Sequence, residues 1–430
     1  MADEQWETRR EAAARTAPAT SDAPDVSIVM PCLNEIQSLP HCIENAKDAL
    51  ARIEATHGLT GEIVIADNGS TDGSQGLAVR LGARVALVDE RGYGAALIGG
   101  GRAARGRFVV MGDCDGSYDF TESVPMIGRL LAGDDVCMGS RFEGGIAPGA
   151  MPWKNRWIGN PVLTGVLNLF FRTGINDAHC GLRALTKDSF DRLNLSSTGM
   201  EFASEMVVKA ALLRLRMSQV PATLSKDLRD RAPHLRPWRD GWRHLRYLFM
   251  LSPAWSFGVP AALMGVFGAV VLMLAAAQTF APGTAPAIGD SWTVMGGAAV
   301  SAAYGVAGMG LAALLVQVLS GYRRAGALLS RAARLATFEG LLAAGLTASV
   351  LGTAVLGVVI ANWMARGFTA APSLLPIVAG TLLVTLGLQT AFGGVLLSVI
   401  GGNRARLTPE VLRPGASARA TEPAPQRAAA

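Results

Sequence analysis

Cysteine and aromatic residues are scarce in this sequence, and their scarcity excludes several kinds of protein. The 430 residues include five cysteines and no C-x-x-C pair, so we expect reduced thiols rather than a zinc site or a disulfide framework. Aromatic residues make up 6% of the chain, without the interleaved aromatic and basic residues that bind single-stranded nucleic acid. We therefore attribute the net charge of +5 to a membrane protein with cytoplasmic arginines, and we expect no nucleic-acid partner.

Charged residues are absent from four long hydrophobic segments in the second half of the chain, Phe257–Phe280, Thr293–Leu319, Gly340–Trp363 and Leu375–Ile400. Each segment exceeds the ~20 residues that a helix needs to cross a bilayer. A pump or an ion-coupled transporter would normally carry ionisable groups in such helices. We therefore expect an all-α transmembrane domain of four helices at 253–402 that serves as an anchor, and its many small residues are compatible with a homo-oligomer.

Arginines are unevenly distributed among the segments that connect these helices. The connection at 322–337 carries four arginines and the chain after Gly402 carries several more, whereas the connections at 281–292 and 364–373 carry one charged residue each. By the positive-inside rule, the arginine-rich connection and both termini are cytoplasmic. The sequence therefore predicts a multi-pass protein of the cell (plasma) membrane whose N-terminal domain lies in the cytoplasm.

The segments that flank the predicted domains are polar. Residues 1–24 have no apolar core and are not a signal peptide, and we expect them and residues 403–430 to be disordered. Residues 226–252 are predicted to form basic amphipathic helices beside the membrane, because aromatic residues are interleaved with Lys and Arg there. One predicted helical face combines Trp238, Trp242, Leu245, Leu248 and Phe249. The alternative is a charged, solvated linker.

Short apolar stretches alternate with helical patterns between residues 25 and 225. The strand candidates are 25–31, 61–67, 84–88, 108–111 and 135–139, and the helix candidates include 39–55, 160–172 and 201–217. Strands that alternate with helices imply a largely parallel sheet. The predicted fold class is a cytosolic, Rossmann-like α/β domain followed by the transmembrane helices.

Two carboxylates spaced one residue apart follow the apolar stretch Phe108–Met111, in Asp113-Cys-Asp115-Gly-Ser-Tyr-Asp119. Ligands of open α/β sheets bind at the carboxyl ends of strands. Such a pair can hold a hard cation, Mg²⁺ or Mn²⁺, that bridges a diphosphate. The sequence therefore indicates a metal-assisted transferase that acts on a nucleotide-activated donor; the alternative is an Asp-rich turn.

Asp67 ends the second strand candidate and precedes the turn-rich Asn68-Gly-Ser-Thr-Asp72-Gly. This carboxylate is positioned to hydrogen-bond a base or a ribose, and the alternative is a helix cap. Gly92 and Gly94 do not complete a G-x-G-x-x-G dinucleotide motif, so we interpret them as positions of close backbone approach.

Five motifs occur in a fixed order: Pro31-Cys-Leu-Asn34-Glu35, Asp67-Asn-Gly-Ser-Thr-Asp72, Asp113-Cys-Asp115, Gly139-Ser-Arg141 and Asp177-Ala-His-Cys-Gly-Leu-Arg183. In this order and spacing the set resembles the inverting glycosyltransferases of family 2, which have the GT-A fold. The resemblance is closest to polyprenyl-phosphate glycosyltransferases, such as dolichyl-phosphate mannose and glucose synthases, and it extends over residues 25–250.

The resemblance implies a role for each matching residue. The donor nucleotide would be bound by Pro31, Asn34, Glu35, Asp67 and Asp113. The metal would be bound by Asp113 and Asp115, with Asp119 as a neighbour. The acceptor phosphate or the donor diphosphate would contact Arg141 and Arg183, and the catalytic carboxylate would be Asp177. The chain departs from the family at Gly116-Ser-Tyr118, where Gln is frequent, and at Leu182, where Phe is frequent.

The implied reaction is hexose transfer from a UDP- or GDP-sugar to a polyprenyl phosphate in the membrane. A polyprenyl phosphate is already an anion near neutral pH, so it needs cations such as arginine rather than a strong general base. The alternatives are a glycosyltransferase that acts on a glycolipid hydroxyl, a synthase that extends a polysaccharide, and an inactive nucleotide-sugar sensor. The Gln-x-x-Arg-Trp motif expected of a processive synthase is absent from the sequence.

Overall fold

The computed structural model describes residues 23–229, 237–283, 286, 288–321, 323, 326, 337–369 and 373–401. The chain divides into two compact units with a boundary between Ser252 and Pro253. The segments predicted to be disordered tails lie outside the described residues, except for residues 23 and 24.

A mixed seven-stranded sheet forms the centre of the first unit, with the strand order β3-β2-β1-β4-β6-β5-β7. Its strands are β1 (Val26–Cys32), β2 (Gly61–Asp67), β3 (Arg84–Leu87), β4 (Phe108–Met111), β5 (Val136–Ser140), β6 (Arg183–Thr186) and β7 (Met217–Pro221). The pairs β1–β2, β1–β4, β2–β3 and β5–β7 are parallel, while β6 runs antiparallel to both β4 and β5. The predicted largely parallel sheet is therefore interrupted by one reversed strand, which inserts between strands that precede it in the sequence.

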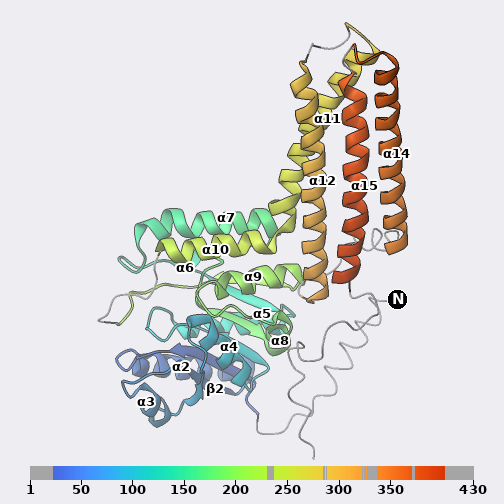
Figure 1. Cartoon of the computed structure of the whole chain (residues 1–430). Helices are drawn as coiled ribbons and strands as arrows, with labels where there is room; N and C mark the ends of the chain where they lie inside the picture. Colours follow the sequence, from blue (N-terminus) through green and yellow to red (C-terminus); the bar gives the residue numbers. More distant parts are fainter. Residues whose placement is uncertain are drawn as a thin grey trace, which may run out of the picture. The chain divides into compact units, whose positions relative to one another are not determined.

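Helices cover both faces of this sheet (Figure 1). One face packs against α2 (Leu39–His57), α3 (Ser74–Arg80) and α5 (Ser123–Leu131), and the other against α4 (Tyr93–Ala103), α7 (Asn160–Phe171), α8 (Lys187–Leu193), α9 (Phe202–Leu212) and α10 (Pro237–Leu251). Strand β1 contributes side chains to the hydrophobic cores on both faces of the sheet. Ile28 and Met30 belong to the core on the face of α2, and Val29 belongs to the core on the face of α4. The short elements are α6 (Arg141–Gly144), η1 (Phe120–Glu122) and η2 (Asn155–Gly159).

The helix predicted at 201–217 is wrong at its C-terminal end. Helix α9 ends at Leu212, and Arg214 adopts a left-handed backbone conformation (φ 55°) that turns the chain. The following residues form the edge strand β7, paired in parallel with β5. The alternation of buried Leu213 and Leu215 with exposed arginines is a strand-like pattern that marks this change.

The basic segment 226–252 contains a helix, but its apolar face differs from the prediction. Leu248 is 1% exposed and packs in the core of the first unit, whereas Trp242 is 64% exposed. The side chains of Trp242, Phe249 and Met250 form the exposed apolar positions of α10. Residues 226–229 are described as coil rather than helix, and the side chain of Trp238 lies outside the described residues.

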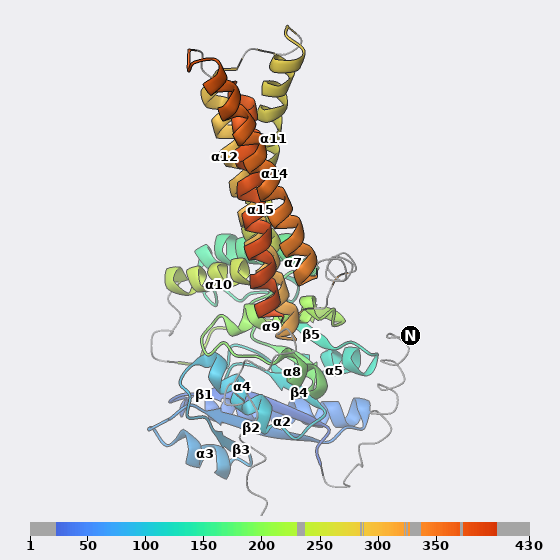
Figure 2. The same ribbon diagram turned by 45° about the vertical axis from the view of Figure 1, so that its right-hand side comes forward.

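The second unit consists of the turn η3 (Ala254–Gly258) and the helices α11 (Val259–Phe280), α12 (Asp290–Leu319), α14 (Phe338–Ala365) and α15 (Leu374–Ile400). Four helices in the described part of the chain are long and apolar enough to cross a membrane, which confirms the predicted all-α domain. In Figure 2, α14 and α15 lie side by side. Their contact requires glycine, because a Cβ at Gly345 would lie 2.5 Å from the carbonyl oxygen of Gly387.

Candidate active site

A cavity of about 760 Å³ opens at the carboxyl ends of β1 and β4 in the first unit. One group of lining residues, which we call the donor wall, consists of Pro31, Glu35, Asn68, Asp113 and Asp115. A second group of lining residues, which we call the helical wall, comes from α7, the segment before it, and α10. It consists of Met151, Asn155, Leu163, Gly241 and His244. Arg141, Arg183 and Arg229 also line the cavity.

Asp67 acts as the anchor of the loop that follows β2. Its Oδ2 accepts hydrogen bonds from the backbone N–H groups of Gly69 and Ser70, each at 3.1 Å, and from Nε2 of Gln75 at 2.6 Å. Its Oδ1 is buried without a hydrogen-bond partner among the described residues. The side chain therefore organises the turn rather than capping α3, whose N-cap is Gly73. Asp67 itself does not line the cavity, although the next residue, Asn68, does. The predicted contact of Asp67 with a base or ribose stays a prediction.

Asn34 holds the two loops of the donor wall together. Its backbone N–H donates to Oγ of Ser70 at 2.9 Å, and its Oδ1 accepts from the backbone N–H of Thr71 at 2.8 Å. Asn34 has a left-handed backbone conformation (φ 57°), which asparagine tolerates better than most residues. Pro31 and Glu35 line the cavity, whereas Asn34 does not, so its contribution is to position its neighbours.

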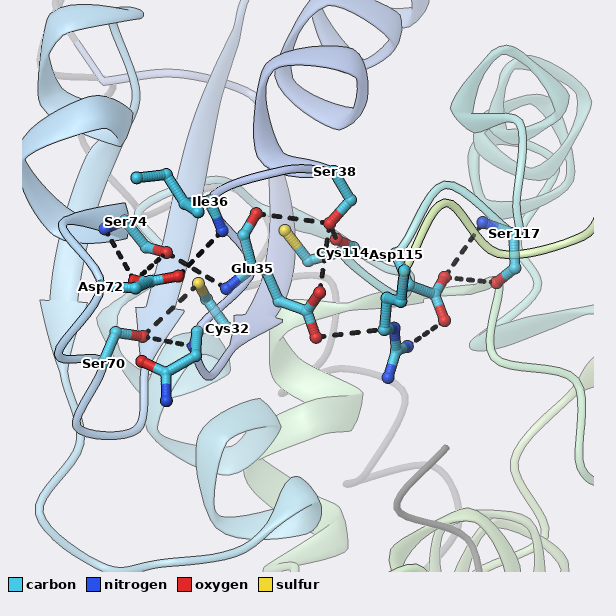
Figure 3. A network of polar contacts seen from close by, with 12 residues as sticks. Cys32, Glu35, Ile36, Ser38, Ser70, Asp72, Ser74, Cys114, Asp115 and Ser117 are labelled. Atoms are coloured by element: carbon cyan, nitrogen blue, oxygen red, sulfur yellow. Dashed lines mark hydrogen bonds and ion pairs between the residues drawn. The ribbon is translucent and has the colours of Figure 1, made fainter. Parts of the chain in front are cut away.

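A continuous polar network extends from these loops to Asp115 of the acidic pair (Figure 3). The backbone N–H of Glu35 donates to Oγ of Ser74, and Oγ of Ser38 donates to the carbonyl oxygen of Cys114 at 2.7 Å. Asp115 accepts hydrogen bonds from the backbone N–H and the hydroxyl of Ser117, at 3.0 and 2.6 Å. The network fixes the backbone between the two carboxylates before any ligand binds.

Asp113 is deeply placed beside two tyrosines. The nearby side chain of Tyr93 favours its charged form, and a Cβ at Gly181 would lie 2.6 Å from its Oδ2. Burial, followed by the negative charge of Asp115, raises the pKa of Asp113 to about 6. The two carboxylates therefore form a site of excess negative charge that a cation would relieve.

Arg229 is a site residue that the sequence reasoning missed. It is hydrogen-bonded to Asp115, and its Nε lies 3.6 Å from Glu35. The sequence offers no motif for this contact, because Arg229 lies in the basic stretch attributed to the membrane surface and is separated from Asp115 by 114 positions.

Arg141 and Asp177 form a buried bidentate ion pair. Nε and Nη2 of Arg141 donate to Oδ2 and Oδ1 of Asp177 at 2.7 and 2.8 Å, and the backbone N–H of Arg141 donates to Oδ2 at 3.1 Å. Asp177 is fully buried and does not line the cavity, whereas Arg141 does. The carboxylate thus orients the guanidinium toward the cavity.

Arg183, the last residue of its motif, begins β6 and is 1% exposed. Its Nη2 donates to the carbonyl oxygen of Cys180 at 2.5 Å, and the guanidinium lies 5.8 Å from the ring centroid of Phe202. Its Nε has no hydrogen-bond partner among the described residues. Arg183 therefore places a positively charged guanidinium at the cavity, and its Nε–H group is not used as a donor within the described part of the chain.

Asp119 does not belong to the acidic pair, contrary to the expectation that it neighbours the metal. Its Oδ1 accepts from the backbone N–H of Thr121 at 2.9 Å, which caps η1, and from Nδ2 of Asn45 at 2.8 Å. It does not line the cavity. The four residues that follow Asp115 turn the chain away, so its spacing in the sequence is misleading.

The carboxylate oxygens at the cavity fit a hard divalent cation that takes few of its ligands from the protein. Among the described residues, no group of three or more His, Cys, Asp or Glu side chains is arranged to hold a metal ion. Magnesium is usually bound by one or two carboxylates, with water and substrate phosphate oxygens as the other ligands. Asp113 and Asp115 match that pattern.

Two protein-family models match the chain. Residues 27–193 match "Glycosyl transferase family 2", and residues 311–401 match "Glycosyltransferase family 2 C-terminal transmembrane region".

Individual proteins show the same similarity. The "Low-salt glycan biosynthesis hexosyltransferase Agl6" of Haloferax volcanii is 34% identical over 397 residues, which cover 89% of this chain and 91% of that protein. The "Dolichol-phosphate mannosyltransferase" of Mycosarcoma maydis is 25% identical over 285 residues, covering 63% of this chain and 92% of that protein. The solved glucosyl-3-phosphoglycerate synthase of Mycobacterium tuberculosis is 22% identical with a TM-score of 0.38, covering 53% of this chain and 78% of that chain.

Proposed function

The chain belongs to glycosyltransferase family 2 and is a membrane glycosyltransferase, and from this premise we propose that it transfers a hexose from a UDP- or GDP-sugar to a polyprenyl phosphate. The observation that carries the choice of acceptor is the ion pair of Asp177 with Arg141. A carboxylate committed to a buried arginine is a poor general base, and a phosphate acceptor does not need one.

The donor wall suits the nucleoside diphosphate and its cation. Asp113 and Asp115 would hold Mg²⁺ or Mn²⁺, which when bound neutralises charge on the leaving diphosphate. The unpaired Oδ1 of Asp67 is suited to an N–H group of the base. Pro31 and Glu35 would border the nucleotide, since both line the cavity.

Arg141 and Arg183 are the groups proposed to meet the acceptor phosphate. Arginine binds phosphate oxygens in a bidentate fashion and stays charged when buried. Both side chains are buried and both line the cavity, so their charges act in a medium of low polarity. We assign Asp177 a positioning role, because its contact with the cavity runs through Arg141.

The chemistry then requires one displacement at the sugar. A phosphate oxygen of the acceptor attacks the anomeric carbon from the face opposite the diphosphate. The bond from that carbon to the diphosphate oxygen breaks, and the nucleoside diphosphate leaves with the electron pair. No proton needs to be removed from the attacking oxygen, and the arginines reduce the repulsion between the two anions.

A lipid acceptor is supported by the exposed apolar side chains of η2, α7 and α10. Trp153 and Trp157 are 63% and 70% exposed. Lys154 and Arg156 lie over these rings, at 5.8 and 5.4 Å from the centroids. Exposed tryptophans paired with basic residues are typical of segments at the interface of an anionic membrane.

The proposed orientation places the first unit and both termini in the cytoplasm, with the second unit in the cell membrane. It follows from the arginines of the connection at 322–337 and of the chain after Gly402. Nucleotide-sugars are cytosolic, which agrees with this arrangement.

The test uses the full chain in membranes with radiolabelled UDP- and GDP-sugars and three acceptors: polyprenyl phosphate, polyprenol and diacylglycerol. We expect label in an acid-labile lipid with polyprenyl phosphate and one donor, loss of transfer with a chelator, and recovery with Mg²⁺ or Mn²⁺. Label in an acid-stable glycolipid or in a polymer would contradict the proposal.

A further inference from the structure

Two histidines and a serine form a hydrogen-bonded chain at the cavity. The hydroxyl of Ser204, in α9, lies 2.7 Å from Nδ1 of His244, in α10, and 3.3 Å from Nε2 of His179, in the loop before β6. The imidazole rings meet edge to face, with their centroids 4.8 Å apart. Three separate elements therefore converge on one hydroxyl, and the proposed reaction gives none of these residues a role.

The hydrogen-bonded chain formed by His179, Ser204 and His244 is buried, but it reaches the cavity at both ends. Ser204 is fully buried and His244 is 6% exposed, while both imidazoles line the cavity. Burial, followed by the charges of His244, Arg141 and Arg183, lowers the pKa of His179 well below its ordinary value. His179 is therefore neutral at pH 7, with one N–H group and one nitrogen lone pair.

One O–H group donates only one hydrogen bond, so Ser204 donates to one imidazole and accepts from the other, and the two possible directions correspond to different tautomers of the two histidines. When Nδ1 of His244 donates to Ser204, the hydroxyl donates to Nε2 of His179, and His179 carries its proton on Nδ1. This nitrogen is buried and has no hydrogen-bond partner among the described residues. A buried N–H group without an acceptor is costly, so an anionic oxygen beside it would be bound favourably.

We propose that His179 binds a phosphate oxygen of the acceptor through its Nδ1–H group, and that Ser204 and His244 are positioning residues that fix this tautomer. The proposal rests on the proposed function, because the phosphate is that of the polyprenyl phosphate. The acceptor is favoured over the donor diphosphate because His244 belongs to the helical wall, built by α7 and α10. Exposed tryptophans occur in the same part of the chain, Trp157 in η2 directly before α7 and Trp242 in α10, whereas the donor diphosphate is proposed to lie at the carboxylates Asp113 and Asp115.

The proposal predicts that acceptor binding and donor binding respond differently to substitution. His179→Ala should raise the KM for polyprenyl phosphate about 10- to 100-fold, the usual effect of losing a hydrogen bond to a charged group. The KM for the nucleotide-sugar should change much less than the KM for polyprenyl phosphate. Direct binding of polyprenyl phosphate should weaken, while binding of polyprenol, which lacks the phosphate, should not.

Ser204→Ala and His244→Ala test the positioning role. Each should raise the acceptor KM in the wild-type background and add little in the His179→Ala background, because they act through His179. His57→Ala is the matched control: its imidazole contacts the carbonyl oxygen of Val124 at 3.2 Å and does not line the cavity. Thermal unfolding in detergent identifies variants that fail to fold.

The outcomes separate this inference from the proposed function. If the wild type uses polyprenyl phosphate but folded His179→Ala keeps the same acceptor KM, the role of His179 is overturned and the proposed function stands. An equal rise in the KM values of donor and acceptor also overturns it, because that would indicate a general distortion. If the wild type does not use polyprenyl phosphate at all, both proposals fail together.

Discussion

The two walls of the cavity are built in different ways. The donor wall is held by strand ends and loops that are joined largely through backbone groups, as in the bonds of the Asn34 N–H group to Ser70 and of Ser38 to the carbonyl oxygen of Cys114. The helical wall depends on contacts between side chains of different helices, such as that of His244 in α10 with Ser204 in α9. The difference indicates that the donor wall is prepared by the sheet and its loops, whereas the helical wall depends on how the helices pack.

This contrast leads to separable effects of substitution. Changes in the donor wall should impair the metal and the nucleotide-sugar, and changes around α7 and α10 should impair the lipid substrate. A variant that affects both substrates equally would contradict the division.

The largest effect is expected from the acidic pair. Asp115→Asn removes a charge that would bind the cation, so kcat/KM should fall on the order of 10³-fold, consistent with the several kcal/mol that a metal contributes. Asp119→Asn is the matched control, because Asp119 caps η1 and does not line the cavity. Similar losses in both variants would show that the acidic stretch acts as a folding element rather than a metal site.

The next effect concerns the buried ion pair of Arg141 with Asp177. Asp177→Asn leaves Arg141 buried without its counter-charge, which should lower the free energy of unfolding by about 3 kcal/mol or more. Thermal unfolding in detergent measures the change, and the double variant Asp177→Asn with Arg141→Met should recover stability without recovering transfer. Loss of transfer with unchanged stability in Asp177→Asn would instead assign that carboxylate to general base catalysis, and with it a hydroxyl acceptor.

The sequence was sufficient to predict that Asp113 and Asp115 follow a strand at the sheet edge, and it was insufficient for the partners of the site residues, for physical reasons. Asp113 and Asp115 follow a buried strand directly, so their position at the sheet edge follows from local pattern alone. The motif that contains Asp177 identified the residue but not its partner, because pairing with Arg141 depends on β6 inserting between β4 and β5. Arg229 was assigned to the membrane surface, since only the folded chain brings it to Asp115.

The predicted α/β domain and the four apolar helices were recognisable because each rests on a repeated local pattern. The helix predicted at 201–217 runs past the end of α9 at Leu212 to the first residue of β7, although Leu213 and Leu215 already alternate with arginines. The face of α10 was misjudged because Leu248 packs into the core, and hydrophobicity alone does not tell a buried position from a membrane-facing one.

A smaller effect is expected from pH. Burial and the charge of Asp115 raise the pKa of Asp113 to about 6, above its ordinary value of 3.8, so the folded, metal-free protein binds this proton more tightly than the unfolded chain. Its stability should therefore fall as the pH rises from about 4 to about 6. Because a metal ligand must be deprotonated, metal affinity should fall as the pH drops below about 6, about tenfold per pH unit. The apparent Kd for Mn²⁺ measured against pH tests this, and a flat profile between pH 5 and pH 7 would contradict it.

The smallest effect is expected at the outer surface of the helical wall. Trp157→Ala removes a ring that is 70% exposed and does not line the cavity, so the fold and the donor KM should not change. If the ring lies at the membrane interface, its loss should weaken binding to anionic vesicles and raise the KM for long-chain polyprenyl phosphate about three- to tenfold, with a smaller change for a short, water-soluble analogue. Leu87→Ala, at an equally exposed position on the edge strand β3, is the matched control. Equal losses for long and short acceptors would place Trp157 in phosphate recognition instead, and the helical wall would then lack its proposed link to the lipid.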